Sequence, residues 1–208
     1  MSNAVPAILP RVIEDGVTTP IPSDNVGRSP DELDWPIEFI LAQHAQWIES
    51  KGQEGGPADL SGIDLRRVGS LAGHALTALI APGATLSGVD LEGALLQGCN
   101  LRNADLCGAK LAGADLRGAN LIGANLERAD LRNARLGPLL ISDARLLPAQ
   151  LDGANARHAD FRGAELRRAR FIAADLTEAN LHDCDLHGAD FTQAILTGNK
   201  ESPTHDVE

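Results

Sequence analysis

The residues best suited to chemistry lie close together near the end of the chain. Residues 182–187 read His-Asp-Cys-Asp-Leu-His, and His158 precedes them. Imidazole, thiolate and carboxylate groups are the ligands of zinc, which needs three or four of them converging at about 2.0–2.3 Å. Whether these side chains converge depends on the backbone that carries them.

Other catalytic signatures are missing from the sequence. There is no phosphate-binding GxxxxGK, no GxGxxG after a strand, no HExxH and no GxSxG. Aspartates are numerous in the middle of the chain, but they recur at a fixed spacing, so pairs of carboxylates arise there without catalytic meaning. The sequence therefore predicts a protein that is not an enzyme and that holds no cofactor.

A five-residue repeat organises the middle of the chain. Every fifth residue from Leu86 to Leu196 is apolar, at 23 consecutive positions and without an insertion. Nineteen of the residues two positions before these central residues are Ala, and the position between them is often Asp or Asn. In an α-helix, five residues advance about 500°, which would spread the leucines around the cylinder. In a straight strand, five residues invert the face. The central residues are buried together only if the chain turns the same way in every unit and winds into a coil.

These units resemble the pentapeptide-repeat family. The run ADLCGAKLAGADLRGANLIGANLERADL (104–131) follows that family's A(D/N)LxX consensus, and the resemblance covers about 58–198. It implies an all-β solenoid, a right-handed quadrilateral β-helix with four pentapeptides per turn. The units before Leu71 are one residue out of register, so we expect an irregular corner around Val68–Ser70.

On such a coil the histidine and cysteine side chains do not converge. Cys184 takes an inward alanine position, whereas His182 and His187 take outward positions on neighbouring faces, so we expect no metal site. Cys99 and Cys184 are 17 units apart, which is too far for a disulfide, and Cys107 points outward. Free thiols are typical of a reducing cytoplasm, where we expect the protein to be located.

The flanks differ from the repeat. Residues 1–33 contain five prolines and are expected to form an extended or disordered arm. Residues 34–52 predict an amphipathic helix, because apolar side chains recur there at spacings of three and four. Trp47 and Ile48 are expected to cap the first coil. Residues 199–208 form a polar tail.

Two apolar surfaces are candidates for contact with other molecules. Residues 134–150 depart from the repeat, with a leucine where alanine is usual and prolines at two corners. With four units per turn, Ile122 is expected on the same face as Leu140, with Leu147 around the next corner, as an interaction patch. The alternative is a local bulge whose leucines fold back onto the rod.

The last coil is the second candidate surface. It holds Phe191, Ile195 and Leu196, and only polar residues follow it. A coil end without a hydrophobic cover predicts a homodimer through these residues.

The net charge of −11 belongs mostly to the flanks. Residues 1–57 carry −6, residues 58–198 carry −3 and residues 199–208 carry −2. The acidic balance argues against direct binding of nucleic acid. No apolar stretch approaches the roughly 18 residues of a membrane span, so no membrane contact is expected.

The resemblance offers one known activity to test against this charge. Some pentapeptide-repeat proteins resemble B-form DNA and bind bacterial type II topoisomerases. Duplex DNA carries one negative charge per ~1.7 Å, so a mimic roughly 28 Å long would need about 16. The repeat falls far short of that. The sequence also shows neither a loop interrupting the coil after Leu86 nor a C-terminal dimerisation helix, features found in such members.

The sequence thus favours a non-catalytic, rigid β-helical scaffold for contact with an unidentified protein partner. A DNA-mimicking modulator or protector of a type II topoisomerase (gyrase) is the alternative.

Overall fold

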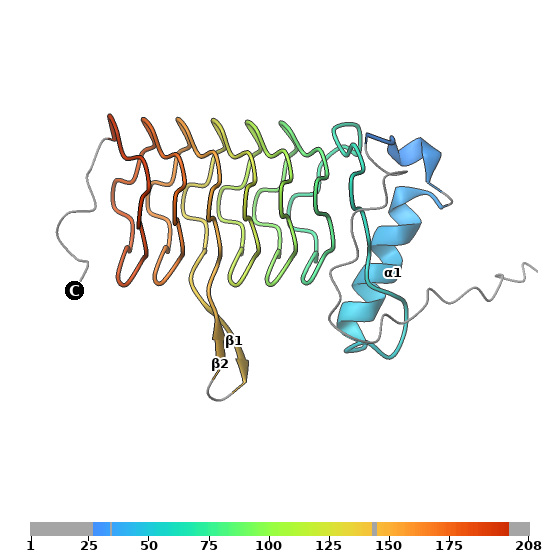
Figure 1. Cartoon of the computed structure of the whole chain (residues 1–208). Coiled ribbons are helices and arrows are strands. Elements are labelled where there is room, and N and C mark those ends of the chain that lie inside the picture. The colour runs from blue at the N-terminus through green and yellow to red at the C-terminus, as the bar shows by residue number, and fades with distance from the viewer. Residues whose placement is uncertain (1–26, 34, 143–144, 200–208) are drawn as a thin grey trace, which may run out of the picture.

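The computed structural model describes residues 27–33, 35–142 and 145–199. In this part of the chain, stacked coils form a rod, with a helix at one end and a hairpin projecting from one side (Figure 1). The regular elements are the 3₁₀ helix η2 (Pro30–Glu32), the helix α1 (Ile37–Glu49) and the strands β1 (Leu139–Ser142) and β2 (Arg145–Leu147).

Each coil of the rod has four sides. Parallel β-bridges connect neighbouring coils in four columns, which begin at Asp59, Asp64, Ser70 and Ala75. We call the corresponding sides faces A, B, C and D, in the order in which the chain passes through them. Along most of the rod, bridged residues are 20 positions apart, as Asp90 and Lys110 are, so four pentapeptides make one coil.

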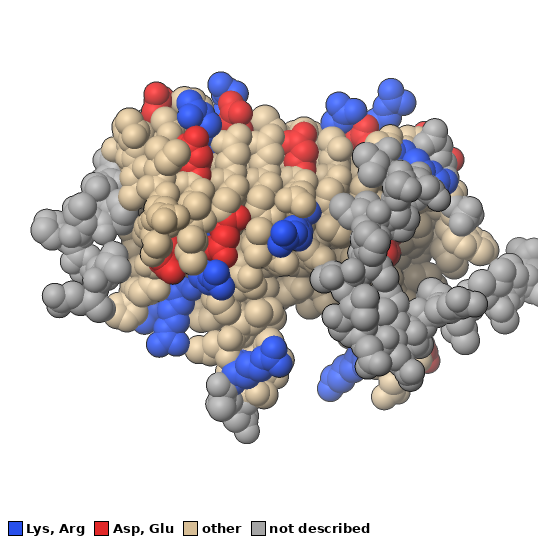
Figure 2. All heavy atoms as spheres, in the orientation of Figure 1, with Lys and Arg blue, Asp and Glu red and all other residues tan. Residues whose placement is uncertain are grey.

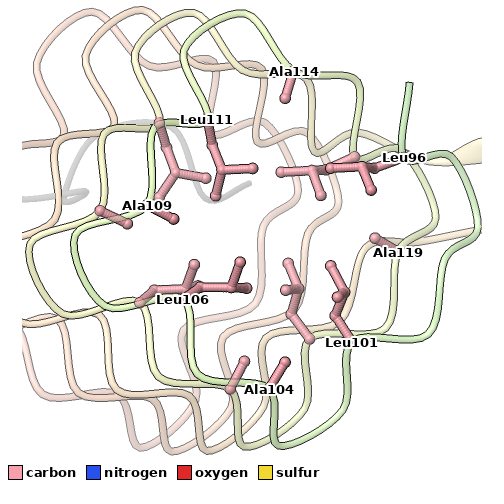
Figure 3. Close-up of a cluster of buried hydrophobic side chains, with 14 of the residues drawn as sticks. Leu96, Leu101, Ala104, Leu106, Ala109, Leu111, Ala114 and Ala119 are labelled. Carbon is pink, nitrogen blue, oxygen red and sulfur yellow. The ribbon is translucent and has the colours of Figure 1, made fainter. Parts of the chain in front are cut away.

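The repeat forms this coil because each position has one role. The central leucines and the alanines before them point into the rod from all four sides and are almost fully buried (Figure 3). The N–H group of Leu106 donates to the Asn125 carbonyl of the next coil at 2.7 Å. The N–H group of Asp105 donates to the preceding coil. Corners need a left-handed residue, which explains the glycines there, such as Gly108 with φ 62°.

The first coil contains the expected irregularity. Asp64 is bridged to Thr85, 21 positions away, whereas Ser70 is bridged to Asp90, 20 positions away. One extra residue therefore lies between Asp64 and Ser70, which confirms the irregular corner predicted around Val68–Ser70.

Part of the predicted N-terminal arm pairs with the first coil. The N–H group of Gly27 donates to the Gly62 carbonyl, and the carbonyl of Arg28 accepts from the N–H group of Asp64 at 2.7 Å. In later coils, the corresponding N–H group donates to a carbonyl group of the coil before. For Asp64 in the first coil, Arg28 supplies that carbonyl. Within the range predicted as an extended or disordered arm, residues 27 and 28 thus pair with the first coil, and residues 1–26 lie outside the described part.

Helix α1 packs on the apolar end of the rod through residues near its start. Ile37 belongs to the buried core, and Ile40 and Leu41 pack against it. These residues make the contact in place of the predicted Trp47 and Ile48, which are only half-buried. Toward the end of the helix, the ring of Trp47 stacks on the imidazole of His44, with a centroid distance of 5.8 Å.

A ten-residue insertion interrupts the coil after Leu136. Asn120 is bridged to Gln150, 30 positions away, and the additional residues form the antiparallel hairpin of β1 and β2. The prediction of an uninterrupted repeat is therefore wrong. Ile141 and Leu146, which hold central positions in the sequence pattern, are 49% and 44% exposed on this hairpin. Because ten residues equal two repeat units, the insertion leaves the five-residue period unbroken.

Candidate interaction surface

The hairpin leaves the rod at the corner between faces D and A. Leu139 is paired with Leu147 across its base, and both side chains are half-buried. Both lie against Gly118 of the rod, and Leu139 also reaches Gly98 one coil earlier. Two glycines in one column thus leave room for two leucines, which attach the hairpin to the corner.

Beyond its base, the hairpin carries an exposed apolar surface. Leu140 is 62% exposed, and Ile141 and Leu146 are about half exposed. We call these three residues the hairpin surface. Figure 2 shows the hairpin projecting from the rod, with basic atoms in blue beside tan ones. Arg145 is the only basic residue in β1 and β2. Exposed large apolar side chains gathered on one element mark a contact surface.

The structure does not bring the predicted patch together. Leu140 is exposed as expected, but Leu147 folds back against the rod, as the alternative interpretation proposed for these leucines. Ile122 follows face A, where its carbonyl accepts from the N–H group of Asn103 in the coil before. Ile122 therefore lies at the A–B corner, one whole face away from the D–A corner. The repeat pattern did not reveal that Ile141 and Leu146 are exposed, because both keep its five-residue spacing. The available signal of an irregularity was the pair of prolines, one on each side of these two residues.

The outer faces of the rod are electrically mixed. On face D, the outward residues run through Asp115, Arg135, Glu165 and Asp185. Arg135 pairs with both Asp115 and Glu165 at 3.2 Å, which connects three successive coils. Other aspartates pair with the arginine two positions later, as Asp130 does with Arg132 at 2.7 Å. Figure 2 shows red and blue side chains interspersed along the face in view.

The histidine and cysteine residues near the C-terminal end lie at separate corners. The His158 ring is 3.1 Å from Glu178 at the B–C corner, and the Cys184 thiol points inward to the Phe161 carbonyl. His182 lies at the C–D corner and His187 at the D–A corner. Among the described residues, no three His, Cys, Asp or Glu side chains are placed to hold a metal ion.

Two surface cavities lie at the N-terminal end of the rod. One, of about 440 Å³, is lined by Ser29, Asp64, Arg66 and Arg67. The Arg66 guanidinium binds the Asp64 carboxylate at 2.6 Å and lowers its pKa to about 2. A carboxylate held ionised in this way is a poor general base near neutral pH. The second cavity, of about 410 Å³, is lined mainly by residues 30–38.

The last described coil presents an apolar end. Phe191 stacks on Phe171 of the coil before, with ring centroids 5.0 Å apart. Phe191 and Leu196 are half-buried, and Ile195 is 49% exposed on face B. The predicted contact residues therefore share one end of the rod.

Comparison with known proteins gives a family and several structural relatives. The family model for pentapeptide repeats matches in eight copies, over residues 84–121, 99–137, 144–183 and 172–198. No curated protein matches the sequence. No helix in the described residues has both the length and the hydropathy required to cross a bilayer.

Three solved structures illustrate the similarity. HetL, a pentapeptide repeat protein involved in heterocyst differentiation regulation in the cyanobacterium Nostoc, is 26% identical over 68% of this chain and 80% of its own, with a TM-score of 0.24. A pentapeptide repeat protein of the Arabidopsis thaliana thylakoid lumen is 30% identical over 61% of this chain and 70% of its own, with a TM-score of 0.27. QnrB1, a plasmid-mediated fluoroquinolone resistance protein, is 18% identical over 70% of this chain and 76% of its own, with a TM-score of 0.31.

Proposed function

The chain belongs to the pentapeptide-repeat family, and from that premise we propose that it is a non-catalytic, rigid scaffold for protein–protein contact. In this proposal the rod is a right-handed quadrilateral β-helix with α1 as its N-terminal cap. The observation that carries the proposal is the hairpin surface, where Leu140 and its neighbours project from an otherwise regular coil. We also propose a location in the cytoplasm, where cysteine thiols stay reduced.

A rigid rod favours binding through such a surface. The backbone of each internal coil is hydrogen-bonded to the coils on both sides, so the corner that carries the hairpin is fixed before a partner arrives. Ordering a surface on binding costs roughly 0.5–1.5 kcal/mol per flexible side chain. Presenting Leu140, Ile141 and Leu146 from a preorganised corner avoids part of that cost. In the two-stranded sheet, each strand has one edge without a strand partner among the described residues, and a partner strand can extend the sheet there.

Modulation of a type II topoisomerase by DNA mimicry is the second candidate function. The hairpin favours it, since loops that interrupt the coil occur in members with that activity, and the sequence had suggested that this chain has none. The paired charges oppose it. Asp64, Asp130 and Asp160 each bind an arginine two positions later, so the rod lacks the unbroken negative surface that a duplex presents.

One comparison of variants tests the scaffold proposal. Leu140→Asp/Leu146→Asp places two charges on the hairpin surface and leaves the rod core untouched. Affinity capture from lysate is expected to lose its specific partner with this variant. It is expected to retain the partner with Phe39→Asp, which alters an exposed apolar residue on α1 at the other end of the rod. Equal capture by the wild type and the hairpin variant contradicts the proposal. A supercoiling assay with purified gyrase tests the alternative, which predicts inhibition or drug protection at micromolar protein.

A homodimer through the last coil is proposed as a separate contact. Phe191, Ile195 and Leu196 supply its apolar surface, and a two-fold interface would bury the same residues of both copies. Sedimentation of the wild type is expected to show a mass that rises with concentration, and Ile195→Asp is expected to shift it toward the monomer. A monomer mass at every concentration excludes the dimer and leaves the hairpin proposal intact.

A further inference from the structure

The contact between α1 and the first coil depends on a buried histidine. The His44 side chain is fully buried, and its Nδ1 atom accepts a hydrogen bond from the N–H group of Ala58 at 3.0 Å. An imidazole nitrogen that accepts cannot also carry a proton, so His44 is neutral, with its proton on Nε2. The ring stacks on Trp47 of the same helix.

This hydrogen bond replaces one that the repeat itself supplies elsewhere. In later units the alanine N–H donates to the preceding central residue, as Ala104 donates to Leu101 at 3.0 Å. Ala58 lies in the first repeat unit, so no central residue of an earlier unit accepts from its N–H group. The imidazole of His44 accepts this hydrogen bond instead. The helix is thus hydrogen-bonded to the rod at the place where the coil begins.

Protonation of His44 is incompatible with this arrangement. A proton on Nδ1 would face the N–H group of Ala58, so two donors would meet and the hydrogen bond would be lost. The same step places a positive charge in the interior, where it needs a partner. On its other side, Nε2 has no hydrogen-bond partner at bonding distance in the described residues.

No charged group of α1 or of the first coil offsets a positive charge on His44. Burial lowers the pKa of His44 below its usual 6.5, and the carbonyl groups of Leu76 and Thr77 oppose this only in part. The first coil carries the titratable residues Asp59, Asp64, Arg66, Arg67 and His74. Asp59 accepts from the backbone and hydroxyl of Ser61.

His74 faces the Ala72 carbonyl through its ring nitrogen. On α1, the acidic residues Glu38 and Glu49 are exposed. None of these groups contributes to the lowered pKa of His44.

We propose that His44 is a proton-sensitive latch, whose protonation releases α1 from the first coil and uncovers the apolar end of the rod. The later coils stay folded, because each is stabilised by its own neighbours. The direction of the pH effect follows from the linkage between proton binding by His44 and the docking of α1. The released histidine titrates near 6.5 and the docked one lower, so the joint is fully stable above pH 6.5 and weakens as the pH falls below it. One proton changes the opening constant by at most tenfold per pH unit.

Hydrogen exchange between pH 7.5 and 5.0, corrected for intrinsic exchange rates, tests the latch. In the full chain, the opening constant of residues 37–49 is expected to rise toward tenfold per unit below pH 6.5, while residues 101–131 stay protected. His44→Asn keeps an acceptor for the Ala58 N–H group without a titrating ring, so its opening constant is expected to stay constant with pH. His74→Asn, a change in an exposed histidine, is expected to behave as the wild type does.

Two results overturn the proposal. The first is a wild-type opening constant of α1 that stays constant from pH 7.5 to 5.0, and this result does not depend on any variant. The second is an NMR titration of the wild type in which the His44 ring has a pKa at or above 6.5. If His44→Asn fails to dock α1 at pH 7.5, this ring titration decides, because a pKa below 6.5 supports the latch.

Discussion

Leu139 packs directly over Gly118, so closely that a Cβ atom on Gly118 would lie 2.7 Å from the Cβ of Leu139. The carbonyl oxygen of Leu147 would be 3.2 Å from the same atom. Neither neighbour can yield easily, since one is the root of a side chain and the other is backbone. The contact at Gly98 is looser, with 3.5 Å to the end of the Leu139 side chain. The attachment of the hairpin therefore rests on the missing side chain of Gly118.

Gly118→Ala is expected to displace the hairpin, and Gly98→Ala is its matched control. Both glycines have positive φ, 68° and 62°, so both alanines bear a similar left-handed penalty of roughly 1–2 kcal/mol. Only Gly118→Ala also pushes against Leu139 and Leu147. Hydrogen exchange of residues 139–147 is expected to quicken strongly in Gly118→Ala and to stay near the wild-type rate in Gly98→Ala. Equal rates in the two variants contradict this account of the attachment.

The hairpin also marks the limit of what the repeat pattern predicts. The coil follows from sequence because each unit places one Leu and one Ala inward, and burial of every fifth residue requires a regular turn. An insertion is visible in such a pattern only when it breaks the period, as it does between Asp64 and Ser70. Ten residues restore the phase, so Ile141 and Leu146 keep the spacing of core residues while lying on the hairpin.

The same insertion changes which residues are stacked. A count of four units per turn predicts Leu136 and Leu176 as the neighbours of Ala156. The bridges of face B instead place Ala156 between Leu126 and Leu176, because Asn125 pairs with Asn155 and Asn155 with Asp175. The N-terminal contacts were unpredictable for another reason. The carbonyl of Arg28 and the imidazole of His44 satisfy the open edge of the first coil by tertiary contact, which leaves no periodic signal.

Ala156 and Phe161 are expected to be energetically coupled. Both are fully buried, and they are the adjacent inward residues on faces B and C of one coil, so a small and a large side chain share its volume. Ala156→Leu overfills the coil, at about 1–3 kcal/mol, and Phe161→Leu leaves a cavity. The double variant restores the usual ring of leucines and is expected to lose less free energy of unfolding than the two single losses together. Denaturant unfolding of the four proteins measures the coupling, and a strictly additive cycle contradicts it.

Asp115 is expected to be the acidic residue of the rod with the largest effect on stability. Its side chain is among the few buried polar groups, with 5% of the residue exposed. It accepts hydrogen bonds from Arg117 at 2.7 Å, from Arg135 at 3.2 Å and from Gln97 at 2.9 Å. Asp115→Asn turns one of its acceptors into a donor that faces other donors. A loss of about 1–3 kcal/mol in the free energy of unfolding is expected at neutral pH.

The pH dependence of that loss separates the charge of Asp115 from its packing. Burial raises the pKa of Asp115, but the hydrogen bonds and charge of Arg117 outweigh burial and leave it below 3.8. The ionised carboxylate therefore stabilises the fold above pH 3.8, and this contribution is lost as the pH falls toward the folded-state value. The stability difference between the wild type and Asp115→Asn is expected to shrink between pH 5 and 3.

Asp130→Asn is the control, because it removes a more exposed pair with Arg132. Its loss of stability at neutral pH is expected to be clearly smaller, because solvent screens that pair. A difference for Asp115→Asn that stays constant down to pH 3 would show that packing, rather than charge, accounts for its role.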